Sequence, residues 1–174
     1  GADGLILDLE DFTPPELRPQ ARQNLPQVVQ TWQDSGALVC IRINQLETDG
    51  PLDLEAAMRA GATVIGYPMA QSGEQMVQLD QAIQAWELLL QIPLGSTEIM
   101  PVCETALGVV AVRDMAAASP RVRSALLGSE DLANDLCAER APDAIELDYA
   151  RRRFVLECRA AGIEPIDAPF TYAD

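Results

Sequence analysis

Short runs of consecutive apolar residues alternate with longer stretches in which apolar residues recur every three or four positions. The short runs predict six β-strands, at residues 4–9, 37–43, 63–68, 98–103, 123–127 and 163–166. Because their apolar positions are consecutive, we expect these strands to be buried on both faces. The longer stretches predict helices at residues 16–34, 52–60, 73–91, 108–118 and 147–161. Pro26 lies inside the first stretch, which is therefore expected to form two short helices.

Strands that alternate with helices across short connections predict parallel βαβ units within one domain over residues 1–174. This pattern is typical of both an open doubly wound sheet and a (β/α)8 barrel. The glycine-rich phosphate-binding patterns of nucleotide folds do not occur in the chain. A barrel needs eight strands and usually about 250 residues. A barrel interpretation therefore implies that some strands are not among these 174 residues.

The formal net charge is −15. Such an acidic surface repels phosphate backbones, so we expect no nucleic-acid partner. No apolar run is long enough to span a bilayer, and we expect no membrane partner. The four cysteines have no C-x-x-C spacing, which favours buried reduced thiols in a cytoplasmic protein: Cys40, Cys103, Cys137 and Cys158. The arginine run at residues 151–153 is expected to be a solvated helix face that balances nearby acids.

The sequence contains no histidine. This absence excludes Ser-His-Asp and Cys-His catalysis and histidine-bound zinc within the chain. Any catalysis by these residues must therefore depend on carboxylates, arginine, backbone dipoles or a bound ion.

Polar residues follow the predicted strands at their carboxyl ends. They are Asp8, Glu10 and Asp11 at the end of the first strand, Arg42 and Asn44 at the end of the second, Glu104 at the end of the fourth, and Glu130 and Asp131 at the end of the fifth. In α/β folds the ligand binds at this edge of the sheet. The carboxyl ends of the strands are therefore the predicted site.

Glu104 and Asp131 follow successive strands, so their carboxylates are candidates for one shared site. Two carboxylates in a partly buried cleft repel each other unless a cation lies between them. Mg²⁺ commonly takes one or two protein carboxylates and completes its shell with water and substrate oxygens. The alternative is that both acids stabilise helix N-termini, and the spacing favours neither interpretation.

Arg42 lies among apolar strand residues and should have an anionic partner. One interpretation is a structural ion pair with Asp8 or Glu10, and the other is binding of a substrate carboxylate. Asp8 stands between two leucines, where an acid is costly without a partner. Asp8 or Glu10 could pair with Arg42, order metal-bound water or accept a proton. Asp11 fits a capped strand end before the following proline pair.

Five stretches together resemble the citrate lyase beta-subunit family of Mg²⁺-dependent lyases and aldolases, in the order in which that family has them. They are ADGLILDLEDFTPPELRPQAR, VCIRIN, IMPVCETALGV, ALLGSEDLANDL and ELDYARRRFVLECRAAGIEPIDAPF. The resemblance extends over nearly the whole chain. It implies a (β/α)8 TIM barrel that lacks its first and last strands in this chain, assembled as a homo-oligomer, either a trimer or a hexamer.

The resemblance also implies a chemistry and a set of roles. Glu104 and Asp131 would be the Mg²⁺ ligands, Arg42 would bind substrate, and Glu104 would also lie against the substrate. Asp8 and Glu10 belong to the segment that lines the mouth of the same site. The implied reaction cleaves a 3-hydroxy-acyl thioester of coenzyme A or of an acyl-carrier protein into an α-keto acid and an acyl thioester, or runs in reverse as a Claisen-type condensation.

Two positions depart from the family pattern. Met69 stands where the family has a lysine, and Cys137 stands where a glycine is usual. These departures leave two alternatives open. One is an aldolase that acts on free pyruvate-type substrates, and the other is a degenerate barrel that serves as an interaction scaffold.

Overall fold

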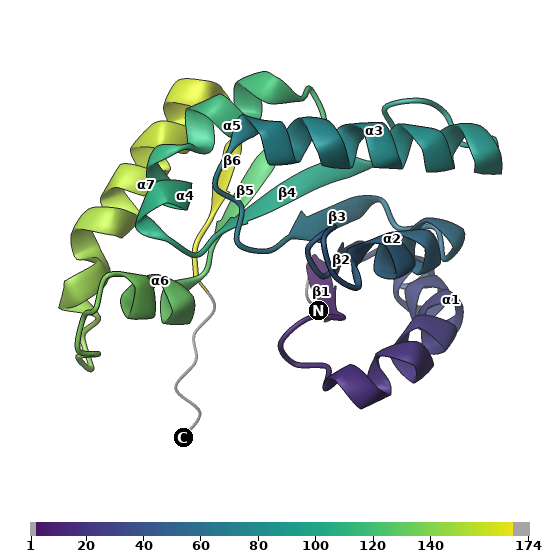
Figure 1. The fold of residues 1–174 in the computed structure, drawn as a ribbon, viewed down its shortest axis with the longest axis horizontal. Helices are drawn as coiled ribbons and strands as arrows, with labels where there is room; N and C mark the ends of the chain where they lie inside the picture. Colours follow the sequence, from purple (N-terminus) through teal and green to yellow (C-terminus); the bar gives the residue numbers. More distant parts are fainter. Residues whose placement is uncertain (1–2, 169–174) are drawn as a thin grey trace. The chain divides into compact units, whose positions relative to one another are not determined.

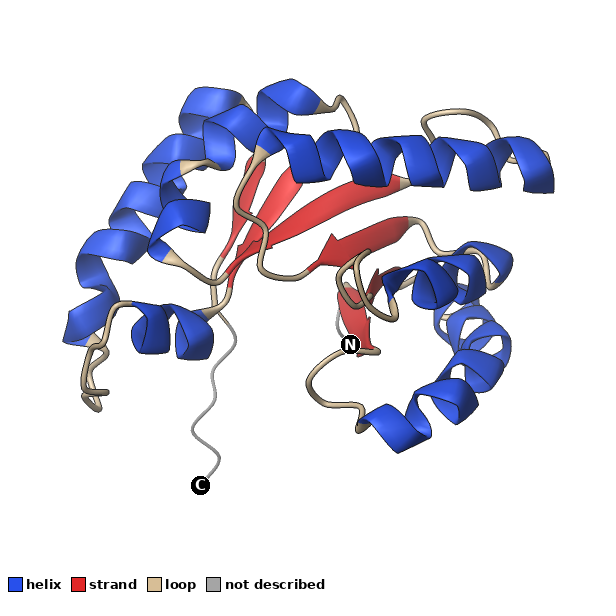
Figure 2. Ribbon diagram, in the orientation of Figure 1, coloured by secondary structure: helices blue, strands red, loops and turns tan. Residues whose placement is uncertain are grey.

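The computed structural model describes residues 3–168, in which strands alternate with helices along the chain (Figure 1; Figure 2). The strands are β1 (Gly4–Asp8), β2 (Leu38–Arg42), β3 (Val64–Tyr67), β4 (Glu98–Cys103), β5 (Ser124–Leu127) and β6 (Glu164–Ile166). The helices are α1 (Arg18–Asp34), α2 (Gly50–Arg59), α3 (Gly73–Leu90), α4 (Ala106–Val110), α5 (Val112–Ala118), α6 (Ser129–Asp135) and α7 (Asp148–Ala161), with 3-10 turns at Pro15–Leu17 and Ile145–Leu147. All six predicted strands are confirmed, and the chain is an α/β protein. Among these residues no helix has both the length and the apolar character that crossing a bilayer requires.

The chain forms two compact units, and the first contains residues 3–68 and 78–99. Its strands pair in parallel in the order β1-β2-β3, and α1 packs against both β2 and α2. The core of this unit is made by fully buried apolar side chains of the strands and helices, including Val29, Ile41, Leu54, Ile65 and Ile83. The pairing places Asp8 beside Arg42 at the ends of β1 and β2.

The first strand differs from the prediction of burial on both faces. In β1 the residues are exposed or half-buried, and Ile6 keeps 44% of its surface exposed. Among the described residues β1 pairs with β2, so a neighbour covers one side of it. The residue that is buried is Leu9, immediately after the strand.

The prediction that Pro26 divides the first helix is wrong. α1 runs without interruption for 17 residues, with Pro26 in its interior. A proline there removes one helical hydrogen bond and costs about 3 kcal/mol. Leu25 and Val29, which flank it, are buried where α1 packs on α2 and β2. Tertiary packing of this apolar face therefore overrides the local preference for a break.

The second unit contains residues 69–77 and 100–168, as far as the structure describes it. Its sheet has the parallel order β4-β5-β6, and α7 packs against α4, α5 and both later strands. The helix predicted at 108–118 is two helices, because the backbone leaves the helical region at Ala111 with φ −89° and ψ 0°. The sequence did not predict α6, a short helix that starts directly after β5.

All four cysteines are free thiols, as predicted, but only three of them are buried. Burial raises the pKa of the Cys40 thiol to about 12, which keeps it protonated and unreactive at neutral pH. Cys137 is the exposed one, and its φ of +52° lies in the left-handed region. This is the position where the resembled family has glycine. Glycine adopts this backbone conformation at little cost, which explains why the family has glycine at this position.

Replacement of Cys137 by glycine is therefore expected to stabilise the protein by about 1 kcal/mol, because a left-handed residue with a Cβ atom is strained. Urea unfolding of the whole protein measures this change. Cys137→Ala is the matched control, since alanine keeps the Cβ atom and is expected to leave the unfolding midpoint unchanged. An equal gain from alanine would show that loss of the thiol, and not relief of backbone strain, is responsible.

Candidate active site

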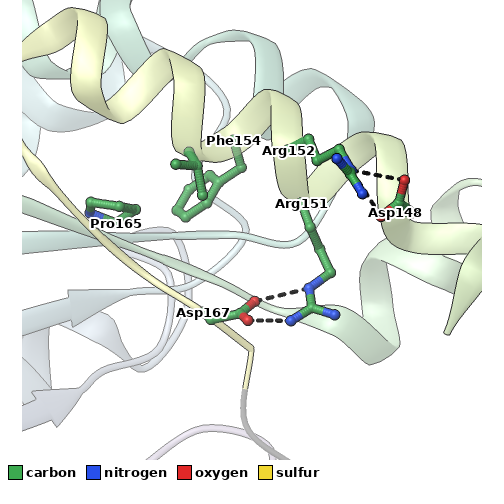
Figure 3. A pocket seen from close by; sticks show the side chains of 7 residues that line it. Asp148, Arg151, Arg152, Phe154, Pro165 and Asp167 are labelled. Carbon is green, nitrogen blue, oxygen red and sulfur yellow. Dashed lines mark hydrogen bonds and ion pairs between the residues drawn. The ribbon is translucent and has the colours of Figure 1, made fainter. Parts of the chain in front are cut away.

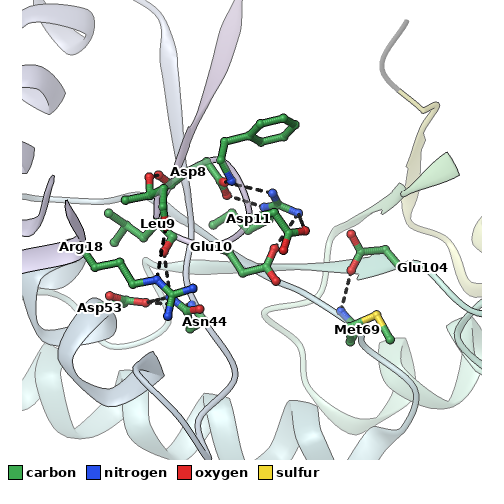
Figure 4. A network of polar contacts seen from close by, with 12 residues as sticks. Asp8, Leu9, Glu10, Asp11, Arg18, Asn44, Asp53, Met69 and Glu104 are labelled. Atoms are coloured by element: carbon green, nitrogen blue, oxygen red, sulfur yellow. Dashed lines mark hydrogen bonds and ion pairs between the residues drawn. The ribbon is translucent and has the colours of Figure 1, made fainter. Parts of the chain in front are cut away.

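An arginine and three acids meet at the end of the first unit's sheet. Arg42 Nε and Nη2 donate to the two carboxylate oxygens of Asp8, the second at 3.0 Å. Its Nη1 lies 2.9 Å from Glu10 Oε2 and 3.7 Å from Asp11 Oδ2. The guanidinium carbon also lies 5.7 Å from the centre of the Phe12 ring. Of the two interpretations of Arg42, the ion pair with Asp8 or Glu10 is present, and it includes both acids, which Figure 4 shows.

This geometry explains why an acid ends an apolar strand. The side chains of Asp8 and Arg42 are only 13% and 11% exposed, so each needs the other's charge. The chain then turns, since the Phe12 amide donates to Asp8 Oδ2 at 2.8 Å and the Thr13 amide donates to the Glu10 carbonyl at 3.1 Å. Because the strand ends at Asp8, the side chains after it need not alternate between the two faces of the sheet, and all three acids reach Arg42.

Asn44, another residue of this edge, is a structural connector within the first unit. Its side-chain amide donates to the carbonyl of Leu9 at 2.8 Å and to Asp53 at 2.6 Å. Asp53 is fully buried in the first turn of α2 and also accepts a bond from Arg22. Sequence reasoning missed Asp53 and Arg22, because an Asp in a helical first turn is common and carries no signal of burial.

The second unit holds Glu104, which is only 4% exposed at the end of β4. Its Oε2 accepts a hydrogen bond of 2.8 Å from the backbone amide of Met69 (Figure 4). Met69 has a φ of +49°, a left-handed conformation that costs roughly 1 kcal/mol for a residue with a side chain. Strain of this kind often marks a functional site. The backbone of Met69, not its side chain, therefore orients the predicted metal ligand.

The backbone that follows Met69 is anchored to β4 and to α4. The next amide, of Ala70, donates to the Val102 carbonyl of β4 at 3.1 Å. A Cβ atom at Gly108 would lie 2.5 Å from the Ala70 carbonyl oxygen, so α4 packs directly on this backbone. The Thr105 hydroxyl caps α4 by accepting the Gly108 amide at 3.0 Å. These contacts hold the donor of the Glu104 hydrogen bond in place.

Gly128 provides the space that Glu104 occupies. A Cβ atom at this position would lie 2.3 Å from Glu104 Cγ and 2.9 Å from its Oε1. The Gly128 amide donates to the Cys103 carbonyl at 3.0 Å, which holds the start of α6 beside the end of β4. Asp131 follows in the first turn of α6 and is half-buried. Sequence reasoning missed Gly128, although its place between a strand and two acids was visible.

Glu130 and Asp131 are adjacent, but their surroundings differ. Arg140 pairs with Glu130 at 2.6 Å and with Glu146 at 2.9 Å, so Glu130 is engaged by the segment that follows α6. Within residues 3–168 no group of three or more His, Cys, Asp or Glu side chains is arranged as a metal site. Two hard carboxylates still match Mg²⁺, which completes its shell with water and substrate oxygens. Glu104 and Asp131 fit that donor set.

A pocket of about 460 Å³ in the second unit contains none of the predicted site residues. It lies between α7 and β6, with Phe154 and Pro165 among its apolar lining (Figure 3). Arg151 pairs with Asp167, which holds the pKa of that carboxyl below its usual range. Arg152 and Arg153 pair with acids one turn away on α7. The predicted role of this arginine run, a helix face that balances local acids, is confirmed.

Comparison with known proteins places these residues in context. The sequence model of the family described as HpcH/HpaI aldolase/citrate lyase matches residues 1–174. Citrate lyase subunit beta of Leuconostoc mesenteroides subsp. cremoris is 36% identical over 174 residues, which are 98% of this chain and 57% of that protein. The chain thus spans little more than half the length of that relative.

Two solved structures are similar over nearly the whole chain. RipC from Yersinia pestis matches with a TM-score of 0.80 at 29% identity, over 99% of this chain and 72% of that one. The citrate lyase beta subunit of M. tuberculosis, complexed with oxaloacetate and magnesium, matches with a TM-score of 0.76 at 28% identity, over 98% of this chain and 70% of that one.

Proposed function

Since the chain belongs to the HpcH/HpaI aldolase/citrate lyase family, we propose that the protein is a Mg²⁺-dependent carbon–carbon lyase. It cleaves a 3-hydroxy-acyl thioester such as citryl-CoA or malyl-CoA into an α-keto acid and an acyl thioester, or forms it by condensation. One observation carries this proposal. Glu104 is a buried carboxylate at the end of a strand, with one oxygen held by a strained backbone amide and its stem accommodated by a glycine.

Glu104 and Asp131 would hold the Mg²⁺ ion. When bound, the ion supplies Lewis-acid polarisation of the keto-acid oxygens. The Met69 amide fixes the orientation of Glu104, and Arg140 keeps the neighbouring Glu130 engaged elsewhere. The solved relative with magnesium and oxaloacetate supports this choice of ion and of keto acid.

Arg42 binds the negative charge of the substrate in this proposal. Its guanidinium is oriented by Asp8 through two hydrogen bonds and by Glu10 through an ion pair. A guanidinium oriented in this way is the proposed donor to a carboxylate or to an enolate oxygen of the substrate. The bonds to Asp8 prevent rotation of the guanidinium. Less conformational entropy of the arginine side chain is therefore lost when the substrate binds.

These 174 residues contain no histidine, so the proton carrier is an acid of the segment at residues 8–11, a bound water or a residue outside this sequence. In the cleavage direction the 3-hydroxyl group loses a proton, the C2–C3 bond breaks, and its electron pair passes to C2 as a thioester enolate. The enolate then takes up a proton, which gives the acyl thioester, and the former carbinol carbon becomes the keto group. Asp8 and Glu10 are the proposed carriers of these protons.

The proposal extends to the complete fold, the partners and the assembly of the protein. The six parallel strands are part of a (β/α)8 TIM barrel whose other two strands are not among these residues. The partners are an α-keto acid and a thioester of coenzyme A or acyl-carrier protein, and the assembly is a homo-oligomer, a trimer or hexamer. The similarity to two longer solved chains, at TM-scores of 0.80 and 0.76, supports the barrel.

Removal of the metal is expected to abolish activity. The whole protein is assayed for keto-acid release from malyl-CoA and citryl-CoA after treatment with a chelator, and again after Mg²⁺ is added. We expect turnover to fall to the uncatalysed background and to return with Mg²⁺, because charge stabilisation by the ion supplies several kcal/mol. Equal turnover with and without the chelator would contradict the proposed mechanism.

Met69 at the family's lysine position favours one second candidate, an aldolase that acts on free pyruvate-type substrates. A lysine at this position would be a cation able to contact the phosphates of a coenzyme A thioester, and methionine cannot replace that contact. Thioester and free-acid substrates are therefore compared in parallel under the same metal conditions. Faster turnover of the free acid would select the aldolase. An absence of turnover, with no heat when Mg²⁺ and oxaloacetate are titrated together, would select the scaffold.

A further inference from the structure

The segment that carries Asp8, Glu10 and Asp11 needs an anchor. All three acids lie within 4 Å of the single Arg42 guanidinium, so one positive charge faces three carboxylates. Like charges at this separation repel, and the repulsion tends to open the segment. The surroundings of Leu9, between the first two acids, show what opposes this tendency.

The anchor is a chain of hydrogen bonds that passes through Asn44 and Asp53. The Asn44 side-chain amide donates to the Leu9 carbonyl at 2.8 Å and to Asp53 Oδ2 at 2.6 Å (Figure 4). The same oxygen accepts the Asn44 backbone amide at 2.9 Å, and Asp53 Oδ1 accepts Arg22 Nε at 2.6 Å. Asp53 is 0% exposed, so these bonds are not exchanged for bonds to water.

We propose that Asn44 and Asp53 form a positioning pair, which holds the acidic segment in register on Arg42 and thereby sets the substrate affinity of the site. Asn44 is two residues beyond Arg42, and it holds the Leu9 carbonyl, which lies between Asp8 and Glu10 in the neighbouring segment of the chain. One side chain thus ties together the two segments that form the cluster. This inference rests on the proposed function, because the affinity in question is that for the lyase substrate.

The variant Asp53→Asn tests the pair. Asparagine keeps the size of the side chain but offers one acceptor oxygen and an NH₂ group, so a donor of either Arg22 or Asn44 then faces another donor. We expect the KM of the thioester substrate to rise about tenfold, as for the loss of one charge-assisted hydrogen bond, with a smaller change in kcat. The dissociation constant of Mg²⁺ should be unchanged, because its proposed ligands, Glu104 and Asp131, belong to the second unit.

Asp49→Asn is the matched control. Asp49 precedes α2, carries the same charge, and also pairs with Arg22, at 3.3 Å, and with Arg18, at 2.9 Å. In the part of the chain that the structure describes, the Asp49 side chain bonds to neither Asn44 nor Leu9, so its substitution is expected to leave KM unchanged. If Asp53 contributed only stability, Asp53→Asn would unfold at lower urea concentration and its KM would equal that of Asp49→Asn.

Hydrogen exchange provides a readout that does not depend on activity. The Phe12 amide donates to Asp8 Oδ2, so its exchange reports whether the acidic segment is held. In Asp53→Asn we expect exchange of residues 8–13 to accelerate about tenfold relative to the rest of the protein. If Asp53→Asn does not fold, Asn44→Ala replaces it, since that variant removes the bond to Leu9 and leaves Asp53 paired with Arg22.

The outcomes separate this inference from the proposed function. An inactive wild-type protein would refute the lyase proposal, while the exchange of residues 8–13 would still decide the role of the pair. An active protein whose variants keep their KM and the exchange rate of this segment would refute the positioning pair. Uniformly faster exchange throughout the protein would also refute it, because that result indicates general destabilisation.

Discussion

Replacement of Glu104 by glutamine is expected to lower kcat by about a thousand-fold, or roughly 4 kcal/mol of transition-state stabilisation. Glutamine has nearly the same shape as glutamate, and its side-chain oxygen can still accept the Met69 amide. The substitution therefore removes the negative charge and leaves the packing of this buried site intact. Steady-state assay of keto-acid release by the whole protein, at saturating Mg²⁺, measures the change.

Glu130→Gln provides the control for this charge removal. Glu130 is an acid of the neighbouring strand end, but it pairs with Arg140 at 2.6 Å and its side chain is 54% exposed. Exposed ion pairs contribute about 1 kcal/mol or less, so we expect kcat to change by less than about fivefold. If Glu104→Gln retained turnover similar to Glu130→Gln, Glu104 would not be a metal ligand and the proposed mechanism would be abandoned.

Replacement of Gly128 by alanine is expected to lower kcat by about a hundred-fold and to weaken Mg²⁺ binding, because a displacement of about 1 Å at a reacting group has effects of this size. The added Cβ atom would lie 2.3 Å from Glu104 Cγ, and the side chain of Glu104 must move. The Gly128 backbone itself, with φ −94° and ψ 106°, accepts alanine without strain. Kinetic assay and calorimetric titration of Mg²⁺ measure the two effects.

A double-substitution cycle tests whether Gly128 acts through Glu104. If it does, adding Gly128→Ala to Glu104→Gln should cause little further loss, because the shared function is already removed. Gly4→Ala is the control for a glycine-to-alanine change, since a Cβ atom there would meet only ordinary contacts of 3.4 Å with Leu38. Additive losses in the double variant would indicate that Gly128 affects activity by another route.

The strands and most helices could be predicted from the sequence because their signals are local. Consecutive apolar residues marked all six strands, and the apolar repeat marked α3 and α7 almost to their ends. The wrong or missing predictions concern helices whose sequence signals are weak or are overridden by tertiary packing. Pro26 was expected to break α1, but buried Leu25 and Val29 keep the helix continuous. The seven residues of α6 are too few to show an apolar repeat.

The sequence predicted which residues belong to the candidate site, but it did not predict which of them contact one another. The acids and Arg42 stand at or just beyond the ends of strands, and parallel strands bring their carboxyl ends to one edge, so the sequence indicated which side chains to consider. The confirmed bond between Asp8 and Arg42 follows from that logic, since each would be costly alone. The proposed metal pair, Glu104 with Asp131, stays a prediction from the sequence and the resemblance.

By itself, the sequence determined the alternation of strands and helices, the absence of histidine chemistry, the acidic surface and the set of strand-end acids. Only the tertiary structure decided how those acids are held: Glu104 by the Met69 amide and the space at Gly128, and the acidic segment by Asn44 and Asp53. The physical reason is the range of the forces involved. Periodicity and charge are properties of neighbours along the chain, whereas a backbone amide, a missing Cβ atom and a buried carboxylate act on residues that only folding brings within 3 Å of one another.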